Sequence, residues 1–389
     1  MVKTVVVLGA GWAGLPLAHK LLKYTVPKVR DKLKVVLVSP NTHFFWNVAA
    51  VRGIIPGAFA DEQLFLPIEP GFKEYGDAFQ FILGKAESIN LEANEVEVVN
   101  NDGHQLSLVY DQLVIATGSQ IRNNLPFKPV GTHEETIKAF HALQDHIEAA
   151  KSIVIAGSGP TGVETAGELA AAYGERKTIT LVMGGDCVLQ ASNALPSVSQ
   201  TIESDLRKLG VKLVYKVKVE RTESIGGAST DGYSRTSLTL SNGEMLTADL
   251  YLPLIGVQVN TKFVPGSLLD ATKSLTLDKN MRVKGVPNVW GIGDVGNIEP
   301  KQLTVTDAQI IHLAAALDAV LTGQSGGVKD YKPSEKPMIF VTLGKKYGTG
   351  QIGGWKLWGF LVRHVKGRYL FVDIALDYVG GRRLRHASM

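Results

Sequence analysis

The chain has 389 residues, of which 45% are hydrophobic and 20% are charged. This globular composition excludes a chain that is disordered as a whole, and the length allows two or three domains. The formal net charge is only +4, and the single cysteine, Cys187, excludes an internal disulfide framework, a CxxC zinc site and a dithiol redox pair.

The first predicted elements are a strand, a glycine-rich turn and a helix. Lys3–Leu8 is a short apolar run, an amphipathic pattern predicts a helix through Leu22, and residues 34–38 predict a second strand. The turn between the first strand and the helix consists of Gly9, Ala10, Gly11, Trp12, Ala13 and Gly14. In such a GxGxxG turn the first glycine permits the tight bend, the second lets the backbone approach a pyrophosphate, and the third lets the helix pack closely. We therefore expect a bound dinucleotide here.

The same pattern recurs in the middle of the chain. Lys151–Ala156 is a second apolar run, a helix is predicted through about Tyr173, and residues 178–182 predict the next strand. The intervening turn consists of Gly157, Ser158, Gly159, Pro160, Thr161 and Gly162. Each GxGxxG lies between a strand and a helix, which is the context that the motif requires. The repeat predicts two dinucleotide sites.

The two copies also end alike. A hairpin with an Asn-Asp-Gly turn at 101–103 precedes a buried run that ends in Ala116, Thr117 and Gly118. A hairpin with a Ser-Asn-Gly turn at 241–243 precedes a buried run that ends at Gly256. Such hairpin turns need residues that tolerate positive φ, and the buried runs are typical of parallel core strands. We therefore expect two units of similar plan, the second inserted into the first.

Both copies lack the acidic residue that usually binds the ribose hydroxyls at the end of the second strand. Ser39 stands there in the first copy and Met183 in the second, with Arg176 and Lys177 nearby in sequence. A serine can still hydrogen-bond a ribose hydroxyl, and a methionine does not repel a 2′-phosphate. The choice between NADH and NADPH is therefore left open.

A third motif makes the pattern more specific. Residues 288–294 read Asn-Val-Trp-Gly-Ile-Gly-Asp. An apolar strand that ends in Gly-Asp, after two GxGxxG units and an Ala-Thr-Gly turn, resembles the flavoproteins with two dinucleotide-binding domains. This resemblance implies FAD in the first unit and NAD(P)H in the second. It also implies that Asp294 binds the ribityl chain and that residues 116–118 pass near the flavin.

One branch of that superfamily is more similar. Residues 47–52 (NVAAVR), 299–301 (EPK) and 350–354 (GQIGG) resemble segments of the AIF-like AMID, or ferroptosis-suppressor, family. The resemblance implies an FAD-dependent NAD(P)H:quinone oxidoreductase. It also implies that Arg52 contacts the flavin and that Ala86 contacts the FAD adenine through its backbone. Since no cysteine pair exists, electrons must leave the flavin directly to a quinone, oxygen or another carrier.

Two further residues are catalytic candidates. The resemblance favours a place for Lys301 at the flavin pyrimidine edge, where a cation stabilises an anionic reduced ring. Glu164 follows Gly162 by two residues, and its functional interpretation is a place beside the nicotinamide. Structural alternatives are a surface or helix-end position for Arg52, a dipole contact in the first helical turn for Glu164, and an exposed loop for Lys301. His312 is either an acid–base candidate or a packing residue. The histidines show no HExxH or HxxH spacing, so we expect no metal site.

The end of the chain differs in charge. Residues 331–389 have six lysines and five arginines against three acidic residues, a net charge of +8, which leaves −4 for the rest. Nine aromatic residues are interleaved with these charges. Such a segment attracts acidic lipid or nucleic acid, or it is a small α+β domain with an aromatic core. Lipid association is motivated by Trp355, Trp358, Arg363, Lys366 and Arg368.

We expect an α/β fold with two Rossmann-like domains and a small C-terminal α+β domain. The predicted FAD domain comprises residues 1–122 and 265–328, the NAD(P)H domain 123–264, and the basic-aromatic domain 329–389. A quinone reductase competes with two alternatives, an AIF-like nucleic-acid-binding signalling flavoprotein and a type-II NADH dehydrogenase. We expect a cytoplasmic protein; peripheral binding to mitochondrial or lipid-droplet membranes and a homodimer stay open.

Overall fold

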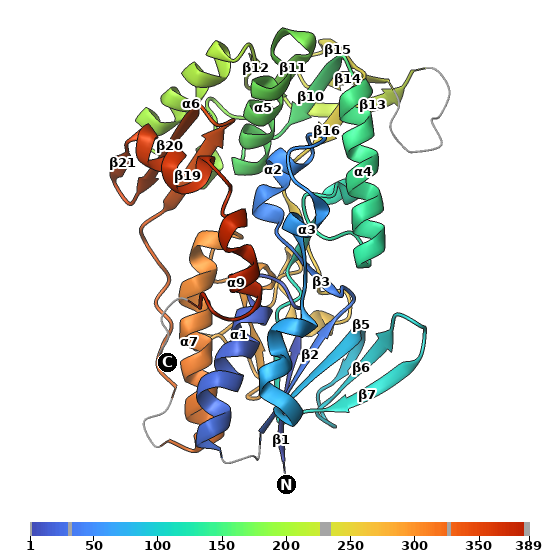
Figure 1. The fold of residues 1–389 in the computed structure, drawn as a ribbon, viewed down its shortest axis with the longest axis vertical. Coiled ribbons are helices and arrows are strands. Elements are labelled where there is room, and N and C mark those ends of the chain that lie inside the picture. The colour runs from blue at the N-terminus through green and yellow to red at the C-terminus, as the bar shows by residue number, and fades with distance from the viewer. Residues whose placement is uncertain (1, 30–32, 226–234, 325–327, 385–389) are drawn as a thin grey trace.

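The computed structural model describes residues 2–29, 33–225, 235–324 and 328–384 (Figure 1). Within these residues it confirms the expected fold class, because two Rossmann-like sheets are accompanied by a small C-terminal α+β region. The final five residues of the predicted C-terminal domain, 385–389, lie outside the described residues.

The larger sheet has seven strands and is built around β1 (Lys3–Leu8). Its order is β18 (Val289–Gly291), β8 (Gln112–Ile115), β1, β2 (Leu33–Ser39), β5 (Phe79–Asn90), β6 (Glu95–Asn100) and β7 (Gln105–Val109). β1 runs parallel to both neighbours, with Val5 opposite Val35 and Gln112. The valines of β1 are fully buried, as expected for a parallel strand covered on both faces.

Two helices cover one side of this sheet. α1 (Gly14–Lys20) continues as a π-helical turn at Leu21–Thr25, so the helical stretch runs three residues beyond the predicted end. α7 (Leu303–Thr322) contacts α1 and is the one described helix long and apolar enough to cross a membrane by length and composition. Its buried face includes Ile310, Leu313 and Leu317, which belong to the core of this unit. A buried core helix meets the same criteria of length and composition as a helix that crosses a membrane.

The second sheet repeats the plan with four parallel strands. Its order is β12 (Lys212–Val214), β11 (Thr178–Val182), β10 (Ser152–Ala156) and β16 (Leu250–Pro253). α5 (Pro160–Tyr173) follows β10 and ends at the predicted residue, and α6 (Pro196–Lys208) follows β11. α4 (His133–Ala149) begins with a capping box between Thr132 and Glu135. A small antiparallel sheet is added by β13 (Val219–Ser224), β14 (Thr236–Leu240) and β15 (Met245–Ala248).

Two chain crossings join the units. β9 (Ser119–Ile121) leads into the second unit and pairs antiparallel with β17 (Val257–Val259), which leads back. A separate hairpin pairs β3 (His43–Phe45) with β4 (Phe65–Pro67), and between them lie the short helices α2 (Ala50–Gly53) and α3 (Asp61–Leu64). The predicted boundaries at residues 122, 264 and 328 stay predictions.

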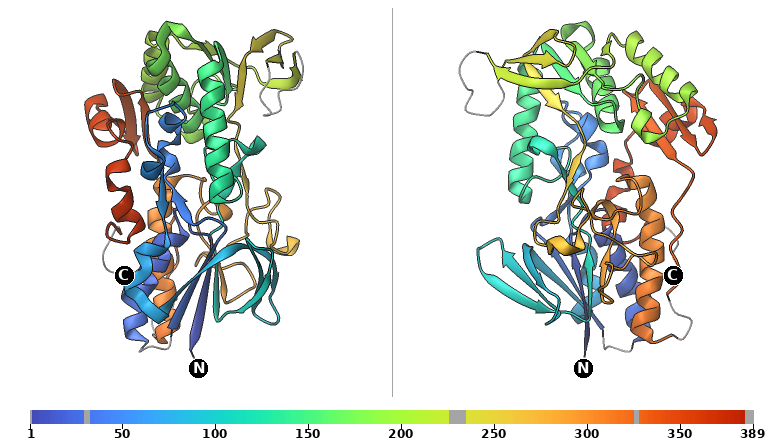
Figure 2. Two further views of the ribbon diagram at one scale, coloured as in Figure 1. Left: turned by 45° about the vertical axis from the view of Figure 1, so that its right-hand side comes forward. Right: turned by 180° about the vertical axis from the view of Figure 1, so that it is seen from behind.

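The C-terminal region spans both units instead of folding apart from them. β19 (Met338–Leu343), β20 (Tyr347–Ile352) and β21 (Trp355–Leu357) form an antiparallel sheet that lies on α5 and α6. A Cβ added to Gly167 in α5 would lie 2.5 Å from Leu343 Cδ2, so this contact is close. After α8 (Gly359–Val362), the chain returns along one side of the molecule to α9 (Ala375–Val379), which contacts α1 (Figures 1 and 2).

Candidate active site

The turn after β1 has the backbone geometry that a pyrophosphate site requires. Gly9 has a φ of +107°, and a Cβ there would lie 2.5 Å from the Ala116 carbonyl oxygen. A Cβ on Gly14 would lie 1.9 Å from the Gly9 carbonyl oxygen, so a larger residue could not begin α1 this close to the turn. An added Cβ on Gly11 would meet no atom within 4 Å. The open position is the one at which a phosphate approaches the backbone.

The turn after β10 repeats this geometry. Gly157 has a φ of +121°, and its added Cβ would lie 2.2 Å from the Leu254 carbonyl oxygen. An added Cβ on Gly162 would lie 1.9 Å from the Gly157 carbonyl oxygen, and one on Gly159 would meet nothing within 4 Å. The second turn therefore also fits a pyrophosphate, and Ser158 lies within it with its carbonyl accepting from Leu189 N at 2.8 Å.

The Ala-Thr-Gly turn at residues 116–118 lies against the first of these loops. Ala116 N donates to Leu8 O at 2.8 Å, which places the turn at the carboxyl end of β1, and Gly118 has a φ of +66°. Thr117 Oγ1 donates to Asn260 O at 2.7 Å, and Asn260 Nδ2 donates to Thr117 O at 2.9 Å. The outgoing and returning chain crossings are thereby joined beside the first dinucleotide turn. Sequence reasoning missed Asn260, which no motif marks.

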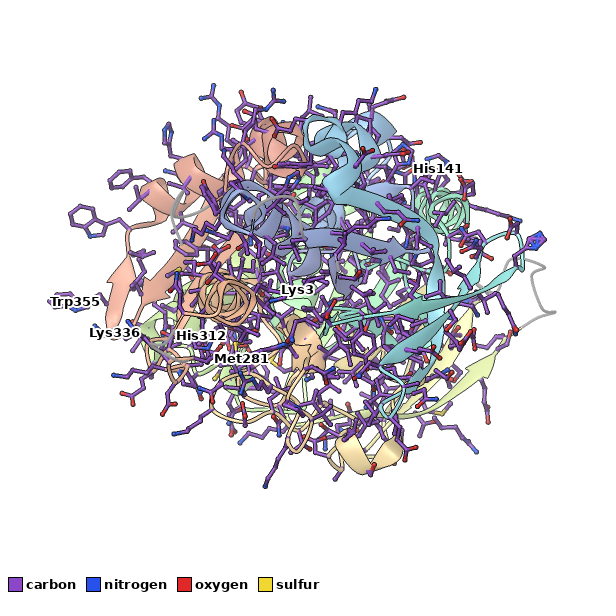
Figure 3. All side chains as sticks on the ribbon, turned by 90° about the horizontal axis from the view of Figure 1, so that it is seen from below. Lys3, His141, Met281, His312, Lys336 and Trp355 are labelled. Atoms are coloured by element: carbon purple, nitrogen blue, oxygen red, sulfur yellow. The ribbon has the colours of Figure 1, made fainter. Side chains whose placement is uncertain are left out.

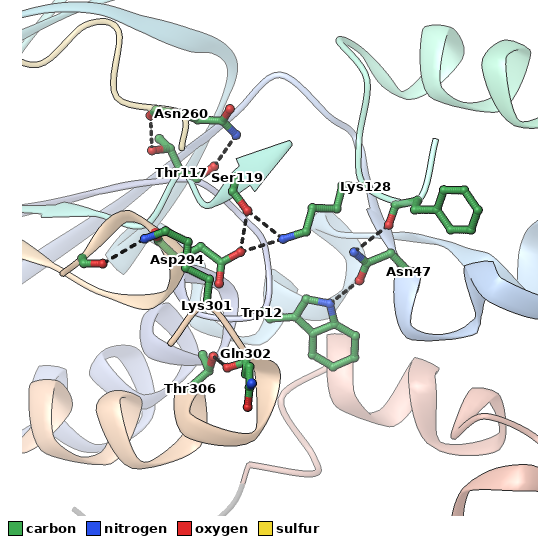
Figure 4. Close-up of polar contacts among 12 residues, drawn as sticks. Trp12, Asn47, Thr117, Ser119, Lys128, Asn260, Asp294, Lys301, Gln302 and Thr306 are labelled. Atoms are coloured by element: carbon green, nitrogen blue, oxygen red, sulfur yellow. Dashed lines mark hydrogen bonds and ion pairs between the residues drawn. The ribbon is translucent and has the colours of Figure 1, made fainter. Parts of the chain in front are cut away.

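Asp294 lies in a turn at Gly293–Val295 and forms a three-residue polar cluster (Figure 4). Its Oδ2 accepts from Lys128 Nζ at 2.6 Å and from Ser119 Oγ at 2.5 Å. Burial alone would raise the pKa of the Asp294 carboxyl, but Lys128 and Ser119, helped by Lys301, outweigh burial and hold the pKa below its ordinary value. The side chain is therefore an anionic hydrogen-bond acceptor near the first turn, since a Cβ on Gly293 would lie 3.2 Å from Ala13 Cβ.

Lys301 supports the same turn from the other side. Its Nζ donates to Asp294 O at 2.8 Å, to Gly296 O at 3.2 Å and to Ser274 Oγ at 3.0 Å. Burial lowers the pKa of the Lys301 ammonium, and the nearby carboxylates oppose this shift. The exposed-loop alternative for Lys301 is wrong, because the ammonium is enclosed by acceptors. Its contact with a flavin stays a prediction.

Trp12 connects the first turn to the C-terminal region. Its Nε1 donates to Asn47 Oδ1 at 2.7 Å (Figure 4). Its carbonyl accepts from Tyr378 Oη at 3.2 Å. The Trp12 ring packs against the rings of Phe44, Trp46 and Tyr378, with centroids 4.6–5.1 Å apart. The first turn is therefore covered by aromatic side chains from residues far apart in the sequence. Ala10 and Ala13 are buried beneath it.

The predicted adenosine contacts lie on the neighbouring strands. Ser39 ends β2 and is buried, and its Oγ accepts from Asn41 N at 3.1 Å, so its hydroxyl proton remains available to an acceptor. Ala86 lies in β5 opposite Val98, in the antiparallel extension of that strand. Both positions are at the carboxyl side of the β1–β2–β5 sheet, where the prediction requires them. Their contacts with FAD stay predictions.

Arg52 is neither on the surface nor free to reach outward. It is 5% exposed in α2, and its Nε and Nη2 donate to the Glu168 carboxylate at 2.8 and 2.9 Å. Nη2 also donates to Gly367 O at 2.9 Å, and Nη1 to Arg368 O at 3.3 Å. Burial raises the pKa of Glu168, and Arg52 opposes this shift. The surface alternative is therefore wrong, and the guanidinium joins α2, α5 and the C-terminal region.

Glu164 lies one helical turn earlier on α5 and is 5% exposed. Its Oε1 accepts from Lys366 Nζ at 2.7 Å and from Thr342 N at 2.9 Å. Lys366 Nζ also donates to Phe340 O at 2.9 Å and is 7% exposed. Lys366 was expected to attract lipid, and this expectation is wrong because its ammonium is buried on Glu164. The sequence offered no sign of this pair, whose members are separated by 202 positions.

The remaining candidates lie elsewhere. His312 Nε2 contacts Asn280 O at 3.4 Å, its ring lies on Tyr331, and burial lowers its pKa. Arg176 and Lys177 precede β11 and bond to backbone carbonyls at the amino end of that strand. They are therefore at the wrong end of the strand for the ribose site that the sequence suggested. Cys187 is a partly buried free thiol.

Comparison with known proteins places this geometry in a family. Residues 3–314 match the model of the pyridine nucleotide-disulphide oxidoreductases. The oxidoreductase ptaL of Pestalotiopsis fici is 40% identical over 98% of this chain and 100% of its own. Ferroptosis suppressor protein 1 of Xenopus tropicalis is 31% identical, over 97% of this chain and 96% of its own.

The fold has close counterparts among solved structures. The sulfide:quinone oxidoreductase of Aquifex aeolicus superposes with a TM-score of 0.77 at 18% identity, covering 98% of this chain and 92% of that one. At this level of identity the likeness shows the fold, and both glycine-rich turns have the backbone geometry of a pyrophosphate site. The chain therefore belongs to the pyridine nucleotide-disulphide oxidoreductase family, as an FAD-dependent oxidoreductase that uses a pyridine nucleotide.

Proposed function

We propose that the chain is an NAD(P)H:quinone oxidoreductase that works at the surface of a membrane. The observation that supports this most strongly is the C-terminal region, which packs over both dinucleotide units and exposes a group of large apolar side chains. The sequence has one cysteine, so no thiol pair is available to accept electrons from the flavin. A hydrophobic acceptor such as a quinone suits an apolar approach of this kind.

The branch resemblance supports the same acceptor. Residues 47–52, 299–301 and 350–354 are similar to ferroptosis-suppressor segments, and relatives of that name align over nearly the whole chain. In this chain these segments lie at points where the C-terminal region meets the dinucleotide units. Arg52 Nη2 donates to Gly367 O at 2.9 Å, and Tyr331 Oη donates to Glu299 Oε2 at 2.6 Å. Gln351 Oε1 accepts from Leu195 N at 2.6 Å.

FAD supplies a ring that accepts a hydride and releases two electrons. The chain holds that cofactor through the backbone of residues 9–14, the anionic Asp294 and, as a proposal, Ser39 and the backbone of Ala86 for the adenosine half. Residues 157–162 hold the pyridine nucleotide pyrophosphate. Glu164, fixed by Lys366, orients the nicotinamide carboxamide, because its Oε2 accepts no hydrogen bond from the described residues and is therefore free to accept one from the nucleotide.

Arg52 acts on this site through its neighbours. Its three nitrogen atoms already donate to Glu168 and to the carbonyls of Gly367 and Arg368. We propose that it is a positioning residue that fixes α5 and the C-terminal region relative to α2, in place of the direct flavin contact that the family motif implied. Lys301 likewise positions the Asp294 turn.

The membrane contact is proposed at an exposed apolar surface between residues 352 and 376. Trp355 is 81% exposed and projects from the edge of the C-terminal sheet (Figure 3). The other members, all exposed, are Ile352, Trp358, Phe360, Leu361, Val365, Tyr369 and Leu376. Single exposed apolar residues are common, but a group of this size marks an interaction surface. The exposed Lys356, Arg363 and Arg368 in the same segment favour anionic lipid headgroups.

An absorbance experiment tests the proposed reaction. The purified protein should be yellow, anaerobic NADH or NADPH should bleach the flavin band, and a soluble quinone should restore it. Oxygen alone should restore it slowly. Bleaching without recovery on quinone addition would remove the quinone from the proposal, and a colourless protein that takes up no FAD would remove the flavin.

Vesicle binding tests the surface. Substituting Trp355, Trp358 and Phe360 together by serine should abolish co-sedimentation with vesicles that contain anionic lipid and leave the reduction of a water-soluble quinone unchanged. Val109→Ser, which removes an equally exposed apolar side chain on β7, is the matched control. Binding that ignores anionic lipid, or that survives the triple substitution, would contradict the assignment.

The net charge of +8 in residues 331–389 also suits nucleic acid, which is the second candidate. Backbone-only binding weakens steeply with salt, so a gel shift that persists at about 200 mM salt would favour this alternative. The apolar surface favours lipid, since exposed aliphatic side chains such as Leu361 and Leu376 do not interact favourably with a charged phosphate backbone. A type-II NADH dehydrogenase is distinguished from the proposed enzyme by strict dependence on NADH.

A further inference from the structure

We propose that the carboxyl edge of β11 and β12 forms a cationic subsite for the 2′-phosphate of NADPH, made by Lys218 while Lys216 neutralises Asp186, and that the chain consequently prefers NADPH to NADH. The proposal rests on pyridine-nucleotide binding to the second unit and deepens it by naming the nucleotide. It concerns the position where the adenosine ribose lies in Rossmann-type folds, at the end of the second strand.

The loop after β11 and the segment after β12 are bonded to each other. Met183 N donates to Val214 O at 2.9 Å, Val217 N donates to Met183 O at 3.1 Å, and Lys216 N donates to Gly185 O at 3.2 Å. Residues 214–218 therefore run directly beside residues 183–185. The segment that contains Lys216 and Lys218 therefore borders the carboxyl end of β11, where the ribose lies in Rossmann-type folds.

The loop itself has no group that suits two free ribose hydroxyls. Met183 occupies the place of the usual carboxylate, and its side chain is 1% exposed in the core. Gly184 and Gly185 follow it and have no side chains. A carboxylate at this point would repel a 2′-phosphate, so its absence removes the common barrier to NADPH. Asp186 is the nearest acid on the loop, and it is already paired with Lys216 Nζ at 2.7 Å.

Two lysines supply positive charge at this point. The Lys218 side chain lies along Gly184, with its Cγ and Cε each 3.3 Å from the position of an added Cβ. Its ammonium has no hydrogen bond or ion pair within the described part of the chain, and the residue is exposed. Lys216 has a φ of +59°, a left-handed conformation that is uncommon for lysine and that its bond to Gly185 O maintains. Since the Lys216 ammonium is paired with Asp186, the Lys218 ammonium is the cation left to meet a phosphate at this loop.

The cations considered from sequence do not serve this purpose. Arg176 and Lys177 lie at the amino end of β11, and a five-residue strand places them about 16 Å from its carboxyl end. Lys212 is exposed at the amino end of β12, which runs parallel to β11. It therefore provides a matched control lysine at the end of the strand far from the proposed subsite.

Calorimetric binding of nucleotide fragments to the FAD-loaded full chain tests the proposal without any turnover. Adenosine 2′,5′-bisphosphate should bind about tenfold more tightly than adenosine 5′-phosphate, as expected for one charge-assisted phosphate contact. Lys218→Ala should remove most of this difference and leave 5′-phosphate binding unchanged, while Lys212→Ala should change neither. The advantage should also shrink as salt rises, because exposed charges are screened.

Three results would overturn the proposal. One is equal binding of the two fragments by the native chain, and another is a loss in Lys212→Ala as large as that in Lys218→Ala. The third is a loss of 5′-phosphate binding in Asp186→Asn, which would make Asp186 a ribose ligand for NADH. Quinone reduction is assayed separately on the same preparations. If the protein does not reduce quinone but still binds the two fragments with different affinities, the proposed acceptor is refuted and this subsite is not.

Discussion

The two glycine-rich turns have nearly the same backbone and very different surroundings. In both, an added Cβ on the third glycine would lie 1.9 Å from the carbonyl of the first, and the second glycine is open. The first turn is covered by Trp12, Tyr378 and the Asp294 cluster, all bonded into the fold. The second turn is bonded to the end of β11, where the exposed Lys216 and Lys218 lie. The shared backbone suits the pyrophosphate that we propose for each turn, and we expect the different surroundings to distinguish a resident cofactor from a nucleotide that must leave.

The largest expected effects separate the two turns. Gly14→Ala forces a Cβ against the Gly9 carbonyl, so FAD retention should fall by more than about tenfold. Gly162→Ala meets the same obstacle at the second turn, so it should retain FAD while anaerobic NADPH no longer bleaches it. The ratio of flavin to protein absorbance and the bleaching rate measure the two effects. A Gly162→Ala protein without flavin would show that the turns do not act separately; circular dichroism checks that each variant is folded.

The contact of the C-terminal region with the second unit should be nearly as sensitive. Lys366→Met leaves Glu164 buried without its cation, which should lower the free energy of unfolding by about 3–5 kcal/mol. Adding Glu164→Gln should restore most of this loss, because the uncompensated charge is gone. Denaturant unfolding of the two single variants and the double variant measures the coupling. If the double variant is as unstable as Lys366→Met, the charge pair is not the cause.

The contact of the same region with the first unit should respond to acid. His19 Nε2 lies 2.9 Å from Val379 O, and burial lowers the His19 pKa to about 4. The unfolded chain then binds more protons than the folded one, so about 3 kcal/mol of stability is present above pH 6.5 and is lost as the pH falls from 6.5 to 4. Stability measured across this range should flatten in His19→Gln. An unchanged slope in that variant would assign the effect to other groups.

The smallest expected effect concerns the Asp294 cluster. Lys128→Met removes the closest cation, which should cost about 1–3 kcal/mol and weaken FAD binding while the second turn still binds nucleotide. Because the Asp294 pKa is lowered, the contribution of the pair is present above pH 4 and is lost as the pH falls through the folded-state pKa. Thermal unfolding at pH 7 and pH 3 compares native and variant protein. A difference that persists undiminished at pH 3 would contradict an ionic origin.

The local elements were largely predictable because their signals are local. The β1 and β11 runs, the helix that ends at Tyr173 and the hairpin turns at Gly103 and Gly243 follow from apolar periodicity and from residues that tolerate positive φ. The π-helical extension to Thr25 was not predicted, because its amphipathic pattern does not distinguish it from an ordinary helical turn.

The polar partners of the site were not predictable in the same way. Lys128 reaches Asp294 across 166 positions, and Lys366 reaches Glu164 across 202, so no spacing rule links them. Arg52 belongs to a recognisable motif, yet its partner Glu168 depends on how α2 packs against α5. The lysines of the basic segment 331–389 looked equivalent in the sequence, but Lys366 is buried whereas others, such as Lys356, are exposed.

By itself the sequence determined that two glycine-rich turns follow apolar strands and that the chain has no pair of cysteines, because glycine spacing and cysteine number are properties of the chain alone. The tertiary structure decided which charges are neutralised and which face solvent. It did so because burial and pairing depend on neighbours that meet only when the C-terminal region has folded back across both units.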